Sequence, residues 1–149
     1  MVAHFVALAL AVWATVHPRA PRLRDAPAIA RAWAQAIDED KRDPVFGSKD
    51  RDCAVGAYYA IRESWLNATA IGDGGKSRGA WQEQSPAGRA DLLTQARAWR
   101  ELLHEGARMC PASPAAPLSG GCEEGRKLAD RRVRYALRAL DYARAEGPL

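Results

Sequence analysis

Apolar side chains recur every three or four residues along most of the chain, a spacing that predicts helices rather than strands. Ile29, Trp33 and Ile37 show it most clearly. The expected helices cover 27–41, 52–66 and 85–106, and a last one begins near 123. This last helix has two apolar stripes and is expected to be central. Threonine and isoleucine are scarce, which also favours helix over sheet, so the pattern predicts one all-α domain.

The second of these helices carries a carboxylate on its apolar face. The residues of this face are spaced by four, four and three: Val55, Tyr59, Glu63 and Leu66. Asp52 is expected to cap the N-terminus of the helix. Glu63 on its own would be a boundary residue that reaches solvent, but it lies just before a glycine-rich turn. A half-buried carboxyl group there can hold a proton near neutral pH, because burial raises its pKa.

Residues 67–82 contain four glycines, which can adopt positive φ angles and let backbone amides approach a ligand closely. A loop and a short β-hairpin both suit this composition. A phosphate-binding loop is not expected, because no strand precedes Gly72 and no Gly-Lys-Ser/Thr follows at the required spacing. The glutamate and the loop together indicate a site that protonates a glycosidic bond and surrounds it with polar groups.

Glu63-Ser64 and the later Ser77-x-Gly79-x-x-Gln82 resemble the core of the lysozyme-like superfamily, nearest to soluble lytic transglycosylases and goose-type lysozymes. In that family a helix ends in Glu-Ser, and the loop after it carries Ser-Gly-x-x-Gln or a close variant. The resemblance is specific over about 53–84 and looser across the later helices. This chain has one additional residue between the serine and the glycine of the loop.

The resemblance implies a helical lysozyme-like domain, all-α or α+β, with a small glycine-rich loop or short β-hairpin at the active-site cleft. It also implies cleavage of the MurNAc-β-1,4-GlcNAc bond of peptidoglycan, with Glu63 first as proton donor and then as base. In a lytic transglycosylase the sugar's own 6-hydroxyl attacks and a 1,6-anhydro product forms, so no second carboxylate is essential. Ser64 would also steady the helix end. The expected substrate-binding residues are Ser64, Ser77, Gly79, Trp81, Gln82 and Tyr135.

Some of these assignments leave alternatives open. Asp73 is a second catalytic candidate, since phage and goose lysozymes hydrolyse with an aspartate that positions water; alternatively, it forms the turn by bonding local amides. Trp81 departs from the family's usual small or apolar pair before the glutamine, and is either core or a stacking surface for a sugar ring. The family's later Ala-Tyr-Asn-x-Gly motif has only a positional counterpart at 118–121, so Tyr135 or Tyr142 would have to supply its tyrosine.

The three cysteines predict one disulfide. Cys110 and Cys122 flank a loop rich in proline, serine and glycine, and an oxidising compartment would pair them. Cys53 is left over as a small buried side chain at the start of the catalytic helix. The chain contains no Cys-x-x-Cys or His-Glu-x-x-His motif, so neither a zinc site nor another cofactor is expected.

Residues 5–16 form an uncharged apolar run, too short for a comfortable membrane span and typical of the central region of a secretory signal. Val12 and Ala14 are small residues that suit cleavage. The expected organisation is a signal peptide or N-terminal apolar segment over 1–20 and a lysozyme-like transglycosylase domain over 21–149, in a periplasmic or secreted protein with no stable membrane span in its mature form. Alternatively, the run is a buried N-terminal helix of a cytosolic or phage-borne protein.

The net charge of +4 suits an anionic polymer such as a bacterial cell wall or a nucleic acid, and selects neither. The arginines are scattered, as on a solvated helical surface, so nucleic acid is not an expected partner. The preferred interpretation is a monomeric muramidase, a lytic transglycosylase, whose partner is the peptidoglycan glycan strand. One alternative is a lysozyme-like module that binds cell wall or protein without cleaving. Another is a basic helical module for nucleic acid, which leaves the glycine-rich loop unexplained.

Overall fold

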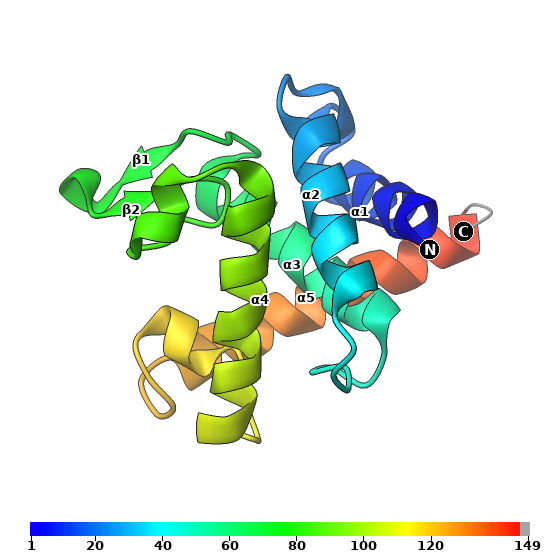
Figure 1. The fold of residues 1–149 in the computed structure, drawn as a ribbon. Helices are drawn as coiled ribbons and strands as arrows, with labels where there is room; N and C mark the ends of the chain where they lie inside the picture. The colour runs from blue at the N-terminus through cyan, green and yellow to red at the C-terminus, as the bar shows by residue number, and fades with distance from the viewer. Residues whose placement is uncertain (147–149) are drawn as a thin grey trace.

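The computed structural model describes residues 1–146, and residues 147–149 of the predicted domain lie outside them. Helices dominate, and an antiparallel hairpin projects from one side (Figure 1). The helices are α1 (Val2–Val16), α2 (Ala26–Glu39), α3 (Lys49–Ser64), α4 (Leu92–Met109) and α5 (Arg126–Glu146). The strands are β1 (Ile71–Gly72) and β2 (Ser77–Arg78), and the short 3-10 turns are η1 (Ala20–Arg22), η2 (Asp73–Gly75), η3 (Pro86–Arg89) and η4 (Ala116–Ser119). The structure confirms the predicted mainly helical class with a short hairpin.

Helix α3 occupies the centre of the molecule. Residues 52–61 are all buried, and α3 packs against α1, α2 and α5. Small side chains allow this close packing: a Cβ on Gly56 would lie 2.1 Å from the ring of Trp33, so α2 contacts the α3 backbone directly. Trp33 also donates its ring N–H to the carbonyl of Cys53 at 2.9 Å. Glu63 is thus carried by the end of a helix that the core holds on several sides.

Helix α5 is not central, so the prediction from its two apolar stripes is wrong. Its buried residues are Ala129, Ala136, Leu140 and Ala143. Tyr135 and Tyr142, which belong to the second stripe, are 45% and 59% exposed. The helix packs against α1 and α3 with one side only, because the long arginine-rich remainder of its surface stays in water.

Two helices begin at residues other than those expected. Ser48 caps α3 through its hydroxyl oxygen. Asp52 lies inside the helix instead, fully buried, where its carboxylate accepts a hydrogen bond from the Arg100 guanidinium at 2.5 Å. Asp91 caps α4, whereas the stretch after Ser85 forms the separate turn η3. The Asp52 carboxylate also accepts hydrogen bonds from the amides of Val45 and Phe46, so it is engaged away from the first turn of α3.

Helix α1 is part of the hydrophobic core. Its fully buried residues include Phe5, Leu8, Val12 and Trp13. Trp13 donates its ring N–H to the carbonyl of Ala57 in α3 at 2.7 Å, and α1 also packs along α2 and α5. This arrangement is the buried N-terminal helix that the sequence allowed as the alternative to a signal; export stays a prediction. Within residues 1–146, no helix has the length and apolar character needed to cross a membrane.

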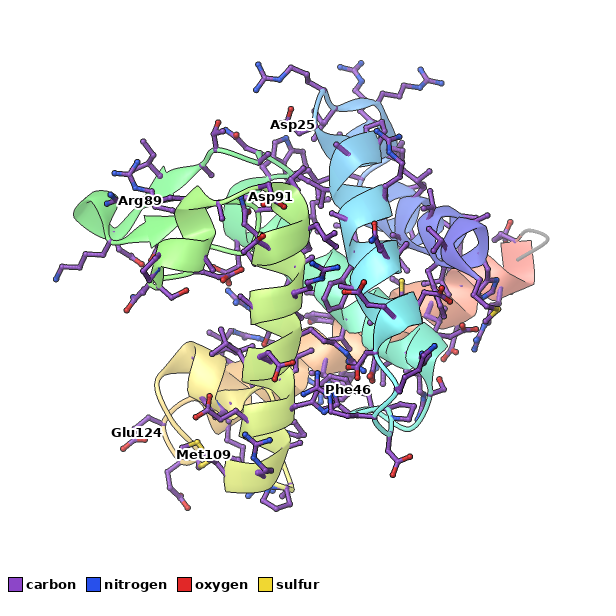
Figure 2. The ribbon with its side chains drawn as sticks, viewed as in Figure 1. Asp25, Phe46, Arg89, Asp91, Met109 and Glu124 are labelled. Carbon is purple, nitrogen blue, oxygen red and sulfur yellow. A yellow bond between two sulfur atoms is a disulfide. The ribbon has the colours of Figure 1, made fainter. Side chains whose placement is uncertain are left out.

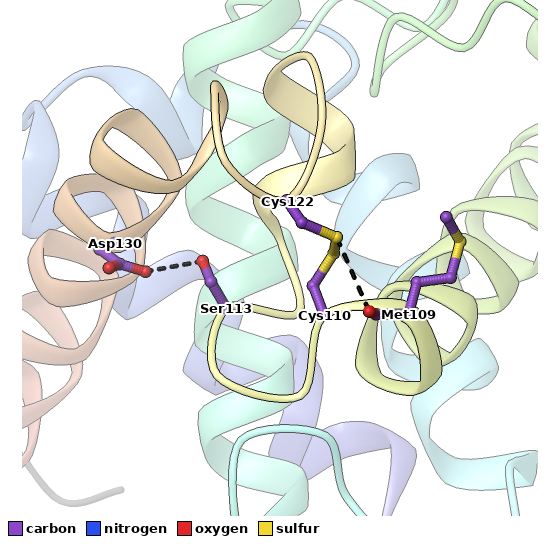
Figure 3. The surroundings of a disulfide bond; sticks show 5 residues. All are labelled: Met109, Cys110, Ser113, Cys122 and Asp130. Carbon is purple, nitrogen blue, oxygen red and sulfur yellow. Dashed lines mark hydrogen bonds between the residues drawn. A yellow bond between two sulfur atoms is a disulfide. The ribbon is translucent and has the colours of Figure 1, made fainter.

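A disulfide joins Cys110, at the end of α4, to Cys122, which precedes α5 (Figure 3). The two Cα atoms are 5.6 Å apart. Cys53 is free and buried, and desolvation raises the pKa of its thiol. The structure confirms both the predicted pairing and the unpaired cysteine. Next to the disulfide, Ser113 donates its hydroxyl hydrogen to Asp130 at 2.7 Å, which ties the intervening loop to α5 as well (Figure 3).

Candidate active-site cleft

A cleft of about 660 Å³ lies between the C-terminal end of α3, the loop after β2, helix α4 and the turn η4. Its volume falls in the range of small-molecule sites in proteins. Glu63 and Gln82 both line it, and Trp99, Leu102 and Leu118 contribute apolar lining. The helix end and the loop that the sequence motif pairs therefore meet in one cavity.

Glu63 is held by an arginine of the last helix. Its carboxylate, one helical turn after Tyr59, accepts a hydrogen bond from Nη1 of Arg132. The Glu63 side chain is 28% exposed and the Arg132 side chain 20% exposed, so the ion pair lies between core and solvent. The Arg132 guanidinium also stands 5.3 Å from the centroid of the Tyr59 ring, a cation–π contact. Helix α5 thus orients the carboxylate that α3 carries.

The chain turns sharply at the end of α3. Ser64 donates its hydroxyl hydrogen to the carbonyl of Ala60 at 2.9 Å and accepts one from the amide of Asn67 at 3.2 Å. Trp65 and Leu66 have left-handed φ angles of 55° and 57°. Ser64 is absent from the described lining of the cleft, so the structure places it at the helix end rather than against a ligand.

Asp73 and Ser77 lie in the hairpin, away from the described lining of the cleft. Asp73 is exposed and has a φ of 51° in the turn between the strands. Ser77 is buried and donates its hydroxyl hydrogen to the Asp73 carboxylate. The two side chains bond each other across the turn, as suits a turn-forming residue, and a catalytic role for Asp73 stays a prediction. Neither residue is brought to Glu63.

Gln82 fixes the loop and also lines the cleft. Its φ is 52°, and its side-chain amide donates to the carbonyls of Ala70 at 3.2 Å and Gly79 at 3.0 Å. Gly79 has a φ of +83°, and a Cβ there would lie 2.3 Å from Oε1 of Gln95. Glycine is therefore required at this position, but it serves the packing of the loop on α4 and does not line the cleft.

Trp81 is mainly a core residue. It is 3% exposed and donates its ring N–H to the carbonyl of Gly56 at 3.0 Å. Its ring stacks on Trp99 with centroids 6.4 Å apart and lies 5.6 Å from the ring of Trp33. Burial favours the core alternative over sugar stacking, and the part of Trp81 that lines the cleft belongs to its floor.

Tyr135 lies elsewhere. Together with Tyr58 and Tyr142 it lines a separate groove beside the C-terminal end of α1. The structure therefore does not bring the tyrosine that the sequence suggested to the cleft of Glu63. The tyrosine that does line this cleft is Tyr59, whose buried hydroxyl has no hydrogen-bond partner within residues 1–146. Burial raises the pKa of this phenol, so it remains a neutral donor.

Glu83 is a residue of the cleft that the sequence did not single out. It is 4% exposed, and in the described part of the chain neither of its carboxylate oxygens has a hydrogen-bond partner. Its backbone exchanges hydrogen bonds of 2.9 and 3.0 Å with Arg78, which fixes Glu83 beside β2. Burial raises the pKa of Glu83 to about 8, so this carboxyl group is protonated at neutral pH.

The sequence gives little indication that Glu83 and Arg132 belong to the candidate site. A glutamate next to the motif glutamine in a polar loop would ordinarily be solvated, and Arg132 is one of several arginines in its helix. The bridge to β2 fixes Glu83 in the loop that lines the cleft, and the packing of α5 on α3 brings Arg132 to Glu63. The one available signal was that Glu83 directly follows the loop motif.

The cleft thus contains two carboxyl groups in unlike environments, Glu63 paired with Arg132 and Glu83 buried without a partner among residues 1–146. A third, Glu101, is exposed at the rim and pairs with Arg42 at 2.6 Å. Carboxyl groups in unlike environments are typical of sites that carry out acid–base chemistry at a glycosidic bond. No protein-family model matches this chain, and no curated protein or solved structure does either.

Proposed function

We propose that the chain is a peptidoglycan-cleaving muramidase, specifically a lytic transglycosylase that cuts the MurNAc-β-1,4-GlcNAc bond with Glu63. The observation that carries this proposal is that Glu63, Trp81 and Gln82 line one cleft of substrate size. The two halves of the lysozyme-like motif resemblance, the helix end and the loop, therefore contribute to the same cavity. Lysozyme-like chemistry needs this arrangement of its motif residues.

The chemistry follows from the position of Glu63. Its partly exposed carboxyl group would protonate the leaving glycosidic oxygen as the bond to the anomeric carbon breaks. The resulting carboxylate would then take the proton of the sugar's 6-hydroxyl, whose oxygen bonds to the anomeric carbon and closes the 1,6-anhydro ring. The proton balance is restored on Glu63. For the first step, the ion pair with Arg132 has to open when the substrate binds, and the Glu63 carboxylate has to take up a proton from the solvent.

Two further observations support this reading. Glu83 is neutral at neutral pH, so it adds a protonated group to the cleft without repelling the Glu63 carboxylate. Asp73 is bonded to Ser77 outside the described lining of the cleft, where it is poorly placed to position a water molecule. The second point favours the anhydro-forming reaction over hydrolysis.

One observation favours a second candidate. The ion pair with Arg132 occupies the Glu63 carboxylate in the free protein, as would suit a lysozyme-like module that binds cell wall or protein without cleaving it. The two candidates differ in a single measurable property, which is whether glycan bonds break.

We therefore expect the purified protein to clear a suspension of peptidoglycan and to release fragments with 1,6-anhydro ends, seen by turbidity and mass spectrometry. Glu63→Gln keeps the size of the side chain and removes its titratable proton. It should slow cleavage by about 100- to 10,000-fold, the usual contribution of a general acid. Circular dichroism should show an unchanged helical fold.

Asp73→Asn is the matched control, because it makes the same acid-to-amide change at an exposed residue of the hairpin. It should keep the rate within a few-fold and the same product. Loss of rate in this control, with reducing ends in the wild type, would identify a hydrolase. Binding without any fragment release would identify the non-catalytic module. Full activity of Glu63→Gln would remove Glu63 from the mechanism.

A further inference from the structure

A second cavity adjoins the cleft on the side of the hairpin. We call it the basic groove; it has a volume of about 540 Å³ and is lined chiefly by Lys76, Arg78, Gln84, Ser85, Pro86 and Arg89. Gln84 and Ser85 line the cleft as well, so the two cavities share one wall. A polymer bound in the cleft would therefore have the basic groove within reach of its substituents.

The charge of the basic groove is one-sided. Lys76, Arg78 and Arg89 line it, and no acidic side chain is among its described lining. In the part of the chain that the structure describes, none of the three forms an ion pair, whereas Arg42, Arg97 and other arginines do. Arg89 lies at the hairpin side of the molecule (Figure 2). Uncompensated cations around one hollow favour an anionic ligand.

We propose that the basic groove binds the carboxylates of the peptide stems carried by the same glycan strand whose sugar bond lies in the cleft. This inference rests on the proposed function. The MurNAc units of a peptidoglycan strand carry peptides that end in free carboxylates, next to the bond that a muramidase cuts. Guanidinium groups bind carboxylates through paired hydrogen bonds, which lysine supplements as a point charge. The shared wall at Gln84 and Ser85 supplies the proximity.

The extent of the groove favours a carboxylate of this kind over nucleic acid. A nucleic acid is held by a run of cations that neutralises many successive phosphates. The described lining of the groove has three cations, Lys76, Arg78 and Arg89. Arginines such as Arg42, Arg97 and Arg100 bond acidic residues and are not available for phosphates. A short, discontinuous anionic substituent fits this distribution better than a continuous polyanion.

The test compares two double variants that remove the same charge. Lys76→Ser/Arg89→Ser changes exposed residues of the groove and spares Arg78, whose backbone holds Glu83. Arg31→Ser/Arg108→Ser changes two exposed arginines outside it and is the control. Both are assayed on intact peptidoglycan and on the same material after an amidase has removed the stem peptides.

We expect kcat/KM of the groove variant on intact strands to fall by about 3- to 10-fold, since exposed ion pairs contribute modestly. On stripped strands it should stay within about twofold of the wild type, as should the control on both substrates. An equal loss on both substrates, or the same loss in the control, overturns the inference while leaving the proposed function intact.

If the wild type cleaves neither substrate, the proposed function fails, and binding then decides the inference. Glu63→Gln would be pelleted with intact and with stripped strands, with and without the two groove substitutions. A preference for intact strands that depends on Lys76 and Arg89 supports the groove as a stem-peptide site; no preference overturns it. Displacement from the groove by a single-stranded oligonucleotide, dependent on the same two residues, would assign it to phosphate and also overturn it.

Discussion

Glu83 is a carboxyl group that the fold holds in an unfavourable environment. Burying a polar group without a hydrogen bond costs about 1–3 kcal/mol, and burying it as a charge costs more. The backbone bridge to Arg78 keeps the residue at the wall of the cleft, where its side chain is 4% exposed. The folded protein consequently keeps a proton that the unfolded chain releases above the ordinary pKa of 4.5.

The raised pKa of Glu83 predicts how the free energy of unfolding depends on pH. Because the pKa of Glu83 is raised to about 8 in the folded state, its contribution to stability is fully present below pH 4.5 and is lost as the pH rises through 8. Glu83→Gln removes this titration. Its free energy of unfolding, measured by urea denaturation, should therefore fall less with pH and should exceed that of the wild type above pH 8.

Glu105→Gln, at an exposed position of α4, should follow the wild-type curve and serves as the control. Parallel pH curves for Glu83→Gln and the wild type would show that Glu83 is already ionised in the folded protein at neutral pH.

The helices themselves were largely predictable, because apolar residues recur along them at a spacing of three to four. Ile29, Trp33 and Ile37 are all buried on α2, as their spacing requires. The boundaries were less predictable, since Ser48 and Asp52 are both good capping residues, and Asp52 is instead engaged by the buried Arg100 and by two backbone amides. Which helix lies at the centre depended on the small residues of α3, which do not register as an apolar stripe.

The candidate site was predictable where it follows the chain and unpredictable where it depends on packing. Glu63 and Gln82 carry a local motif, and they do line one cleft. Asp73 shares the motif loop, but a side-chain bond to Ser77 keeps it in the turn. Arg132 reaches Glu63 only because α5 packs on α3. Its helix is rich in arginine, and no local sequence pattern distinguishes the arginine that makes this contact from the others.

The contribution of the buried helix α1 to stability can be tested by shortening one of its core side chains. Leu8 is fully buried, so Leu8→Ala should lower the free energy of unfolding by about 2–5 kcal/mol through lost burial and a residual cavity. Leu10→Ala, two residues later and only partly buried, should cost clearly less. Chemical denaturation of both variants measures the difference. Suppose that neither substitution changes the free energy of unfolding and that the mass of the mature protein lacks these residues. Then α1 is removed as a signal and is not part of the mature fold.

At the scale of the whole molecule, the disulfide closes a loop between the last two helices. A crosslink over a loop of this length stabilises by about 3 kcal/mol in the chain-entropy account. Reduction of the wild type, or Cys110→Ser/Cys122→Ser, should therefore lower the unfolding midpoint and also the rate of wall cleavage. Thiol titration of the denatured wild type should find one free cysteine, Cys53.

Cys53→Ala is the control for this experiment, since it removes the buried free thiol and leaves the bonded pair in place. Its unfolding midpoint should still respond to reductant as that of the wild type does. A wild type whose midpoint and activity are both indifferent to reductant would contradict a stabilising role of the crosslink.

The same crosslink has a consequence for the order in which the molecule matures. The loop that it closes carries Pro117, Leu118 and Gly120, which form one side of the cleft. The other sides are built by helices and a hairpin that can assemble while both thiols are still reduced. Oxidation would then stabilise the last side of the cleft, so under the proposed function a freshly made chain would cleave glycan more slowly until it reached an oxidising space.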